Sequence, residues 1–218
     1  MVVVNNGFMR EAPTRSWRGN SAEERRAERR ARLIDAGLEL IGTIGWTATT
    51  VRGICRQARL TERYFYEAFS DREALLVAVF DEVREEGTLA VISALESLPD
   101  ADPKHRARAA IEAGIGLVLD DPRRGRVLLL EGATSPDLQR RRSEGLLATS
   151  LLLAQLSQQF VTGPTDPTDA LLNATALVGA ETQLVAAYMS GALDVTRERL
   201  LDHITELHFA AVAVSSSA

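Results

Sequence analysis

Helix-start signals recur along the whole chain, and they constrain its fold more than any other sequence feature. In four places an aspartate or serine, which can cap a helix through its side chain, stands directly before a proline, whose missing N–H costs nothing in the first turn. These pairs are Asp102-Pro103, Asp121-Pro122, Ser135-Pro136 and Asp166-Pro167. Two capping boxes, Ser21 with Glu24 and Ser70 with Glu73, mark further helix starts. Because no convincing strand alternation occurs between these signals, we expect an all-α fold.

The signals divide the chain into about nine helices with mostly short connections. The expected ranges are 21–44, 50–58, 61–67, 71–97, 103–119, 122–131, 136–161, 167–192 and 196–213. Thr50 and Thr61 are expected to cap the two short helices. Residues 1–20, with a proline, a glycine and scattered arginines, are expected to form a disordered N-terminal arm.

The composition is that of a soluble globular protein. Of the 218 residues, 45% are hydrophobic and 25% are charged, which are ordinary values. We find no apolar run of about 18 residues that would cross a membrane. The single cysteine, Cys55, excludes an internal disulfide and fits a reducing cytosol. We therefore expect a cytoplasmic protein.

The charge is unevenly distributed. Residues 1–72 contain 13 arginines, no lysine and 9 acidic residues, a balance of +4. Residues 73–218 contain 12 basic and 21 acidic residues, a balance of −9, which brings the chain to its net charge of −5. A basic N-terminal part on an acidic remainder indicates that only the N-terminal part meets a polyanion such as DNA, although chance sorting of surface charge would give the same balance.

The two short helices between residues 50 and 69 have the spacing of a helix-turn-helix. The first has one apolar stripe at i, i+3, i+4 and i+7, formed by Val51, Ile54, Cys55 and Ala58. On the second, Phe65 and Phe69 form an i, i+4 pair that we expect to be buried. Two short helices joined by a tight turn and supported by a longer helix place a recognition helix in the DNA major groove.

Three blocks in this region resemble the TetR/AcrR family of transcriptional regulators. Residues 45–52 match the glycine–aromatic–x–x–Thr–Thr–Val segment of the family, residues 60–69 match its recognition-helix segment, and residues 71–76 match the opening of its fourth helix. The resemblance implies a helix-turn-helix DNA-binding head of three helices at 21–70. It also implies a helical-bundle body at 71–218 that binds a ligand and dimerises.

The resemblance further implies which residues touch DNA. Tyr66 matches the position whose hydroxyl reaches a phosphate, and Tyr64 matches a base-facing position. Arg63 is expected to read guanine O6 and N7. Glu62 either accepts a hydrogen bond from cytosine N4 or orients Arg63. Contacts to the phosphate backbone are expected of Thr50, Arg52, Thr61 and Arg72.

The sequence departs from the family pattern at the turn and in the recognition helix. The family usually has glycine where Arg59 stands, so this arginine is expected to adopt a left-handed backbone conformation. The recognition helix has Glu62, Arg63 and Tyr64 where smaller residues are frequent, which bears on the operator that is read.

The body has a helix with two different faces at 167–192. One face is rich in small residues that let two helix axes approach closely, as a two-fold interface requires. Its residues are Leu172, Ala176, Gly179, Ala180, Gln183, Ala187 and Ser190. The opposite face is apolar except for Glu181. By resemblance, we expect a homodimer formed through the last two helices.

Three body residues are candidates for ligand contact. A carboxylate in an apolar row needs a partner or a proton, so Glu181 either pairs with an arginine or marks a polar spot in a ligand cavity, with Tyr188 two turns further on. Glu131, at the end of an apolar run, is a similar candidate. We find no catalytic motif, no metal site and no cofactor fingerprint in the sequence.

These observations predict a TetR-like repressor that binds a near-palindromic operator in double-stranded DNA as a dimer and is released by a small apolar effector. Two other functions remain open at this stage. In the first, the protein is a ligand-independent regulator or an activator. In the second, its body acts mainly as a protein-interaction module.

Overall fold

The computed structural model describes residues 21–131, 136–158 and 166–215, and these residues are arranged as helices without any strand. The elements are α1 (Ala22–Ile44), α2 (Val51–Ala58), α3 (Glu62–Ala68), α4 (Arg72–Ser97), α5 (Pro103–Asp120), α6 (Pro122–Gly125), the π-helix η1 (Arg126–Leu130), α7 (Pro136–Ser157), α8 (Pro167–Met189) and α9 (Arg197–Ser215). The all-α expectation is confirmed. The arm expected at 1–20 lies outside the described residues.

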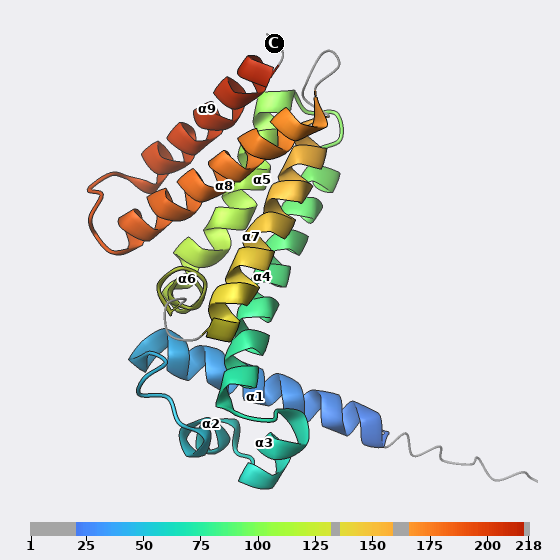
Figure 1. Cartoon of the computed structure of the whole chain (residues 1–218), viewed down its shortest axis with the longest axis vertical. Coiled ribbons are helices and arrows are strands. Elements are labelled where there is room, and N and C mark those ends of the chain that lie inside the picture. Colours follow the sequence, from blue (N-terminus) through green and yellow to red (C-terminus); the bar gives the residue numbers. More distant parts are fainter. Residues whose placement is uncertain (1–20, 132–135, 159–165, 216–218) are drawn as a thin grey trace, which may run out of the picture.

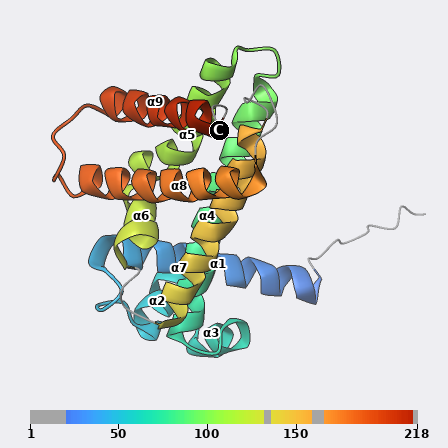
Figure 2. The ribbon, with the colours of Figure 1, turned by 45° about the horizontal axis from the view of Figure 1, so that its top comes forward.

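Three helices form a small head, and the remaining helices form a longer body. In Figure 1 the head, α1–α3, lies at the lower end, and α4 rises from it into the body. α4 packs against α5 and α7, and α8 packs against both α7 and α9. Figures 1 and 2 show α4 and α7 running side by side in the same direction, away from the head.

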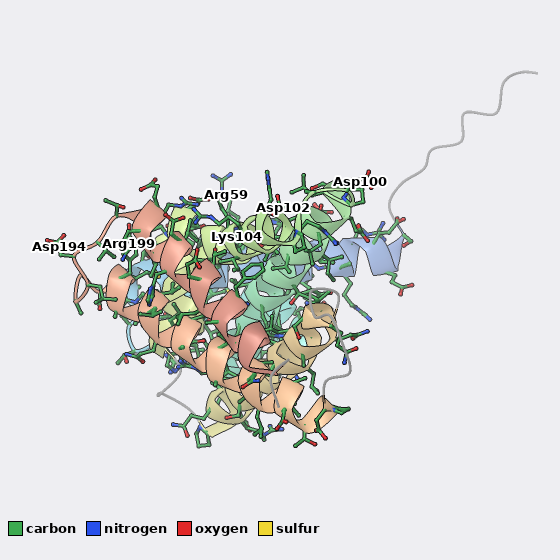
Figure 3. The ribbon with its side chains drawn as sticks, turned by 90° about the horizontal axis from the view of Figure 1, so that it is seen from above. Arg59, Asp100, Asp102, Lys104, Asp194 and Arg199 are labelled. Carbon is green, nitrogen blue, oxygen red and sulfur yellow. The ribbon has the colours of Figure 1, made fainter. Side chains whose placement is uncertain are left out.

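The proline-linked helix starts are confirmed wherever the structure describes them. Asp102, Asp121 and Asp166 each accept backbone N–H hydrogen bonds in the first turn of the helix that follows. Figure 3 shows Asp102 beside Lys104, one of the two residues whose N–H it accepts. Ser135 lies outside the described residues.

The other cap predictions have mixed outcomes. Ser21 forms the predicted capping box with Glu24 at α1, and the Thr50 hydroxyl accepts the N–H of Gly53 at α2. Thr61 occupies the N-cap position of α3, but its side chain makes no capping hydrogen bond.

The capping box predicted at Ser70 and Glu73 is wrong. Asp71 caps α4 by accepting the N–H of Ala74, and Ser70 donates its hydroxyl to the Asp71 carboxylate. A charged acceptor makes the stronger hydrogen bond, which explains why the helix begins one residue later than predicted. The Ala74 N–H also lowers the pKa of Asp71.

The segment predicted as one helix at 122–131 is an α-turn followed by a π-turn. α6 ends at Gly125, and η1 continues to Leu130 with the N–H of Glu131 donating to the carbonyl of Arg126. π-helical turns are rare in proteins, and those that occur often lie at functional sites. Here the π-turn lies where the body meets the head.

One hydrophobic core joins the head to the start of the body. Leu33, Ile54 and Phe65 of the head are fully buried in the same cluster as Leu75 and Leu76 of α4. Val127 of η1 and Leu138 of α7 complete this cluster. Packing is therefore continuous across the boundary that the sequence places at 70/71.

α8 is apolar, but much of it is uncovered. By length and composition it is the one helix of the described residues that could cross a membrane, with a mean hydropathy of 1.2, yet only 22% of that window is buried. Its inner side packs against α7 and α9, and its outer side is exposed, as in a helix at the surface of a bundle. A single such helix is weak evidence for a membrane span.

Candidate nucleic-acid interface and body cavity

The turn between α2 and α3 positions the recognition helix. Arg59 has φ 53° and ψ 46°, so the predicted left-handed conformation is confirmed. The N–H of Leu60 closes the turn by donating to the carbonyl of Cys55. Arg32 of α1 donates to the carbonyl of Ala58 at 2.6 Å, which holds the end of α2 against α1.

The four aromatic residues of α3 and its flank have separate environments. Phe65 and Phe69 are 0% and 6% exposed, which confirms that both belong to the core. Tyr66 is 58% exposed, and its ring meets Phe65 edge to face. Tyr64 is half-buried with the Arg29 guanidinium 4.6 Å from its ring centroid. Of the two tyrosines, Tyr66 has the more accessible side chain.

The charged residues of the head are paired differently from the sequence-based hypothesis. Glu62 pairs with Arg52 at 3.2 Å, and Arg63 pairs with Glu67 at 3.0 Å. Arg63 is thus oriented by Glu67, one turn further along α3, and not by Glu62. The Arg52 and Arg63 side chains are 89% and 83% exposed. Such surface pairs contribute only about 0–1 kcal/mol, so DNA phosphates or bases can replace them at little cost.

Arg72 is engaged within the head. Its guanidinium lies 3.9 Å from the centroid of the Trp46 ring and donates to the carbonyls of Trp46 and Thr49. These contacts fix the loop between α1 and α2, which ends at the capping residue Thr50. The expected phosphate contact of Arg72 stays a prediction.

A close contact joins α1 to α6. A Cβ added to Gly42 would lie 2.7 Å from the Arg123 Cα, so only glycine allows the two backbones to approach this closely. The Arg123 side chain forms ion pairs with Glu39 of α1 and with Asp121. The Arg123 hydrogen bond is the main cause of a lowered pKa at Asp121.

A second contact joins η1 to the loop after α1. Glu131 is 8% exposed and accepts a hydrogen bond from the Trp46 backbone N–H at 3.3 Å. The Glu131 carboxylate also pairs with Arg126 at 2.9 Å, and Arg126 donates to the carbonyl of Thr43. Glu131, proposed from the sequence as a ligand contact, thus links the body to the head.

The body contains a cavity of about 310 Å³ with walls from α4, α5, η1, α7, α8 and α9. Its lining is mostly aliphatic, and Arg84, Glu181 and His208 are the charged or titratable residues in it. The Glu181 carboxylate contacts Nε2 of His208 in α9, so its partner is a histidine where the sequence predicts an arginine. Glu131 and Tyr188 are absent from the lining, and Tyr188 packs beside the apolar cluster of α5, α8 and α9.

Sequence reasoning missed Arg84 as a site residue. Its signal is a stripe along α4 at i, i+4, i+7 and i+11, formed by Arg84, Thr88, Val91 and Leu95, all of which line the cavity. This stripe could have been found from the sequence, but nothing there shows that it faces a cavity.

The head has the arrangement of a helix-turn-helix DNA-binding unit, and the body is a helical bundle that contains a cavity. Residues 33–79 match the family described as bacterial regulatory proteins, tetR family. The head and the start of α4 thus have the DNA-binding region of the TetR family of transcriptional regulators.

Among curated relatives, the HTH-type transcriptional regulator BetI of Klebsiella pneumoniae (strain 342) is 31% identical over 83 residues, which are 38% of this chain and 43% of BetI. The chain thus spans less than half the length of the curated relatives that it matches. A TetR-family regulator structure from Syntrophomonas wolfei superposes with a TM-score of 0.69 at 14% identity, over 86% of this chain and 96% of that one. The multidrug binding protein EbrR, complexed with imidazole, gives a TM-score of 0.60 at 23% identity over 82% and 94%.

Proposed function

We propose that the protein is a homodimeric repressor that binds a near-palindromic operator and is released by a small, mainly apolar effector in the body cavity. The observation that carries this proposal is the short path from cavity to head. Leu128 and Leu129 of η1 line the cavity, and Glu131, at the end of the same turn, hydrogen-bonds to Trp46 in the head. A change in the cavity wall therefore acts on a segment that is bonded directly to the DNA-binding unit.

The DNA-binding part of the proposal rests on α3. This helix presents the exposed side chains of Arg63 and Tyr66, and its N-cap hydroxyl at Thr61 is not used for capping. Arg63 would read a guanine, and Tyr66 would donate to a phosphate. In a dimer, two such helices enter successive major grooves about 34–36 Å apart, which is why we expect an inverted repeat.

The dimer part of the proposal rests on the free face of α8. The small-residue face predicted from the sequence is largely exposed, with Leu172 at 62%, and a Cβ at Gly179 would meet nothing within 4 Å. On α7, Leu147 and Leu151 are each 52% exposed and extend this apolar surface. Exposed apolar patches of this kind mark interfaces.

The outward side of α9 is polar. Its exposed residues Arg199, Asp202, His203 and Glu206 are charged or titratable, and Figure 3 shows Arg199 at the edge of the body. Asp202 and Glu206 pair with Arg108 and Lys104 of α5. We therefore propose α8 as the centre of the dimer interface, with α9 at its border.

Release by an effector requires a difference in affinity. The effector must bind the DNA-incompetent state more tightly than the DNA-competent state, or the equilibrium does not shift. A cavity of about 310 Å³ lies at the lower end of the range for small-molecule sites, about 300–1,000 Å³. EbrR, which has this fold, is described as binding imidazole, so the fold accommodates a small molecule in that protein.

Selection of binding sites from random duplex DNA at two salt concentrations tests the proposal. We expect an inverted repeat that persists at the higher salt concentration. Only weak, unpatterned binding that disappears with salt would refute operator recognition and would favour a protein partner for the body. Operator binding that no cavity ligand changes would favour a ligand-independent regulator, and increased transcription on binding would favour an activator. Because the operator DNA lies in the cytoplasm, we also propose that the protein is cytoplasmic.

A further inference from the structure

Arg84 faces the cavity from the middle of the inward side of α4. The cavity-lining residues of this helix are Val83, Arg84, Gly87, Thr88, Val91 and Leu95. At 100° per residue these positions span one side of the helix, and Arg84 lies near its centre. Its inward direction is therefore a property of the helix register and does not depend on one rotamer.

The Arg84 guanidinium has no hydrogen-bond or ion-pair partner among the residues that the structure describes. Four carboxylates of the body are paired with other residues: Asp81 with Arg141, Glu86 with Arg124, Glu144 with Arg140 and Arg141, and Glu181 with His208. Arg84 is half-buried beside aliphatic side chains, where an unpaired positive charge is costly. The unpaired Arg84 guanidinium in the cavity lining therefore indicates that its anionic partner is a bound ligand.

The opposite wall leaves room for the arginine. Gly145 of α7 is buried, and a Cβ there would lie 3.0 Å from the Arg84 Cδ and 3.7 Å from its Nε. The arginine stem therefore crosses α7 at a residue without a side chain. One turn on from each residue, Thr88 and Thr149 line the cavity, and further along the two helices the lining is aliphatic, with Leu95 and Leu156. Along α4 and α7 the lining thus changes from polar at Arg84 to mainly aliphatic, while Glu181 and His208 line the cavity from α8 and α9.

We propose that the effector is an amphiphile with one anionic group, a carboxylate, held by Arg84, and an aliphatic body along α4 and α7. A guanidinium presents a planar pair of donors that matches a carboxylate in a bidentate geometry. The cavity of about 310 Å³ is about twice the ~150 Å³ of a protein cavity that binds benzene, which corresponds to about twelve heavy atoms. Decanoate has about this size.

The other charged residues of the lining do not favour a cationic effector. The Glu181 carboxylate already has a partner in His208, and the two side chains are only 22% and 14% exposed. A cation would have to displace His208 from Glu181 and would still face the unpaired Arg84. An anion on Arg84 requires neither change.

Calorimetric titration of the full-length protein without DNA tests the proposal with three ligands of equal chain length. These are decanoate and decylammonium, each below its micelle-forming concentration, and 1-decanol, below its solubility limit. Decanoate is expected to bind at least tenfold more tightly than decanol, since a charged hydrogen bond contributes about 1.5–3 kcal/mol, or roughly 10- to 100-fold. In Arg84→Gln, decanoate should lose this advantage while decanol keeps its affinity. Arg84→Lys, which keeps the charge, should restore part of it.

Arg140→Gln is the matched control, because Arg140 is a surface arginine of α7 outside the cavity lining, and it should leave all three affinities unchanged. The decanol affinity of Arg84→Gln also reports whether the cavity is intact. Equal binding of decanoate and decanol to the wild type, no binding of decanoate, or preference for decylammonium would each overturn the proposal. The inference rests on the proposed function for the role of the ligand as effector. Because the titration contains no DNA, its failure is distinct from a failure of operator binding.

Discussion

Replacing Arg59 by glycine should stabilise the protein, although it removes a side chain from the DNA-binding head. Arg59 has φ 53° and ψ 46°, a conformation that costs a residue with a Cβ about 1–2 kcal/mol. Glycine removes this cost but loses more entropy on folding, by about 0.4–1 kcal/mol. The net expectation is a stabilisation of about 0.5–1 kcal/mol. The hydrogen bonds of the turn use backbone groups of Arg59 and Leu60, so the substitution leaves them intact.

Urea denaturation of the full-length protein, followed by circular dichroism, measures this effect. In thermal denaturation of the same variant, a gain of about 1 kcal/mol in the free energy of unfolding raises the midpoint by roughly 2–4 °C for a chain of this size. Arg59→Ala is the matched control, because it removes the same side chain but keeps the Cβ in the left-handed region. If the glycine variant is no more stable than the alanine variant, the assignment of strain to this position is refuted.

Four further substitutions test the site, the dimer and the head–body contact. Tyr66→Phe should weaken binding to all DNA sequences by roughly tenfold through loss of one phosphate hydrogen bond, and unchanged affinity in a gel-shift titration would contradict the assigned role. Arg63→Ala should relax base preference at one operator position by about 1–3 kcal/mol in competition binding, whereas a uniform loss over all sequences would indicate a phosphate contact instead. Gly179→Arg should give a folded monomer in sedimentation velocity, since the position is open in the protomer, and a persistent dimer would exclude α8 as the interface centre. Asp121→Asn should make the free energy of unfolding less dependent on pH in acid. The Arg123 hydrogen bond lowers the pKa of Asp121 in the folded protein. The stabilisation by this carboxylate is therefore present above its unfolded pKa of about 3.9 and is lost as the pH falls through its folded pKa. Equal pH dependence of wild type and variant would show that the Asp121–Arg123 pair contributes nothing.

The sequence predicts local structure well where one side chain and its near neighbours determine the outcome. Asp102, Asp121 and Asp166 cap their helices as expected, because cap and proline act within one turn. Arg59 is left-handed as expected, because the turn geometry is set by a few residues. The capping box at Ser70 is wrong because Asp71 offers a stronger acceptor one residue away.

Contacts between segments that are distant in the sequence depend on the tertiary packing and are not predicted by local patterns. Glu131 bonds to Trp46 across 85 positions of sequence, and only the folded packing of η1 against α1 brings them together. The apolar row around Glu181 predicts that this carboxylate needs a partner, but the identity of that partner, His208, depends on how α8 and α9 are aligned. Arg84 belongs to a visible helical stripe, yet its importance comes from a cavity built by six elements.

The shared core of head and body has a consequence for the exchange of DNA specificity between related proteins. Leu33, Ile54 and Phe65 of the head are covered by Leu75 and Phe80 of α4, beyond the point where the recognition elements end. A chimaera joined after residue 70 would separate these partners and expose the core of the transplanted head. A DNA-binding segment that is exchanged between related proteins must therefore include the first turns of α4, up to residue 80. The same minimum length of the segment applies to natural recombination and to protein engineering.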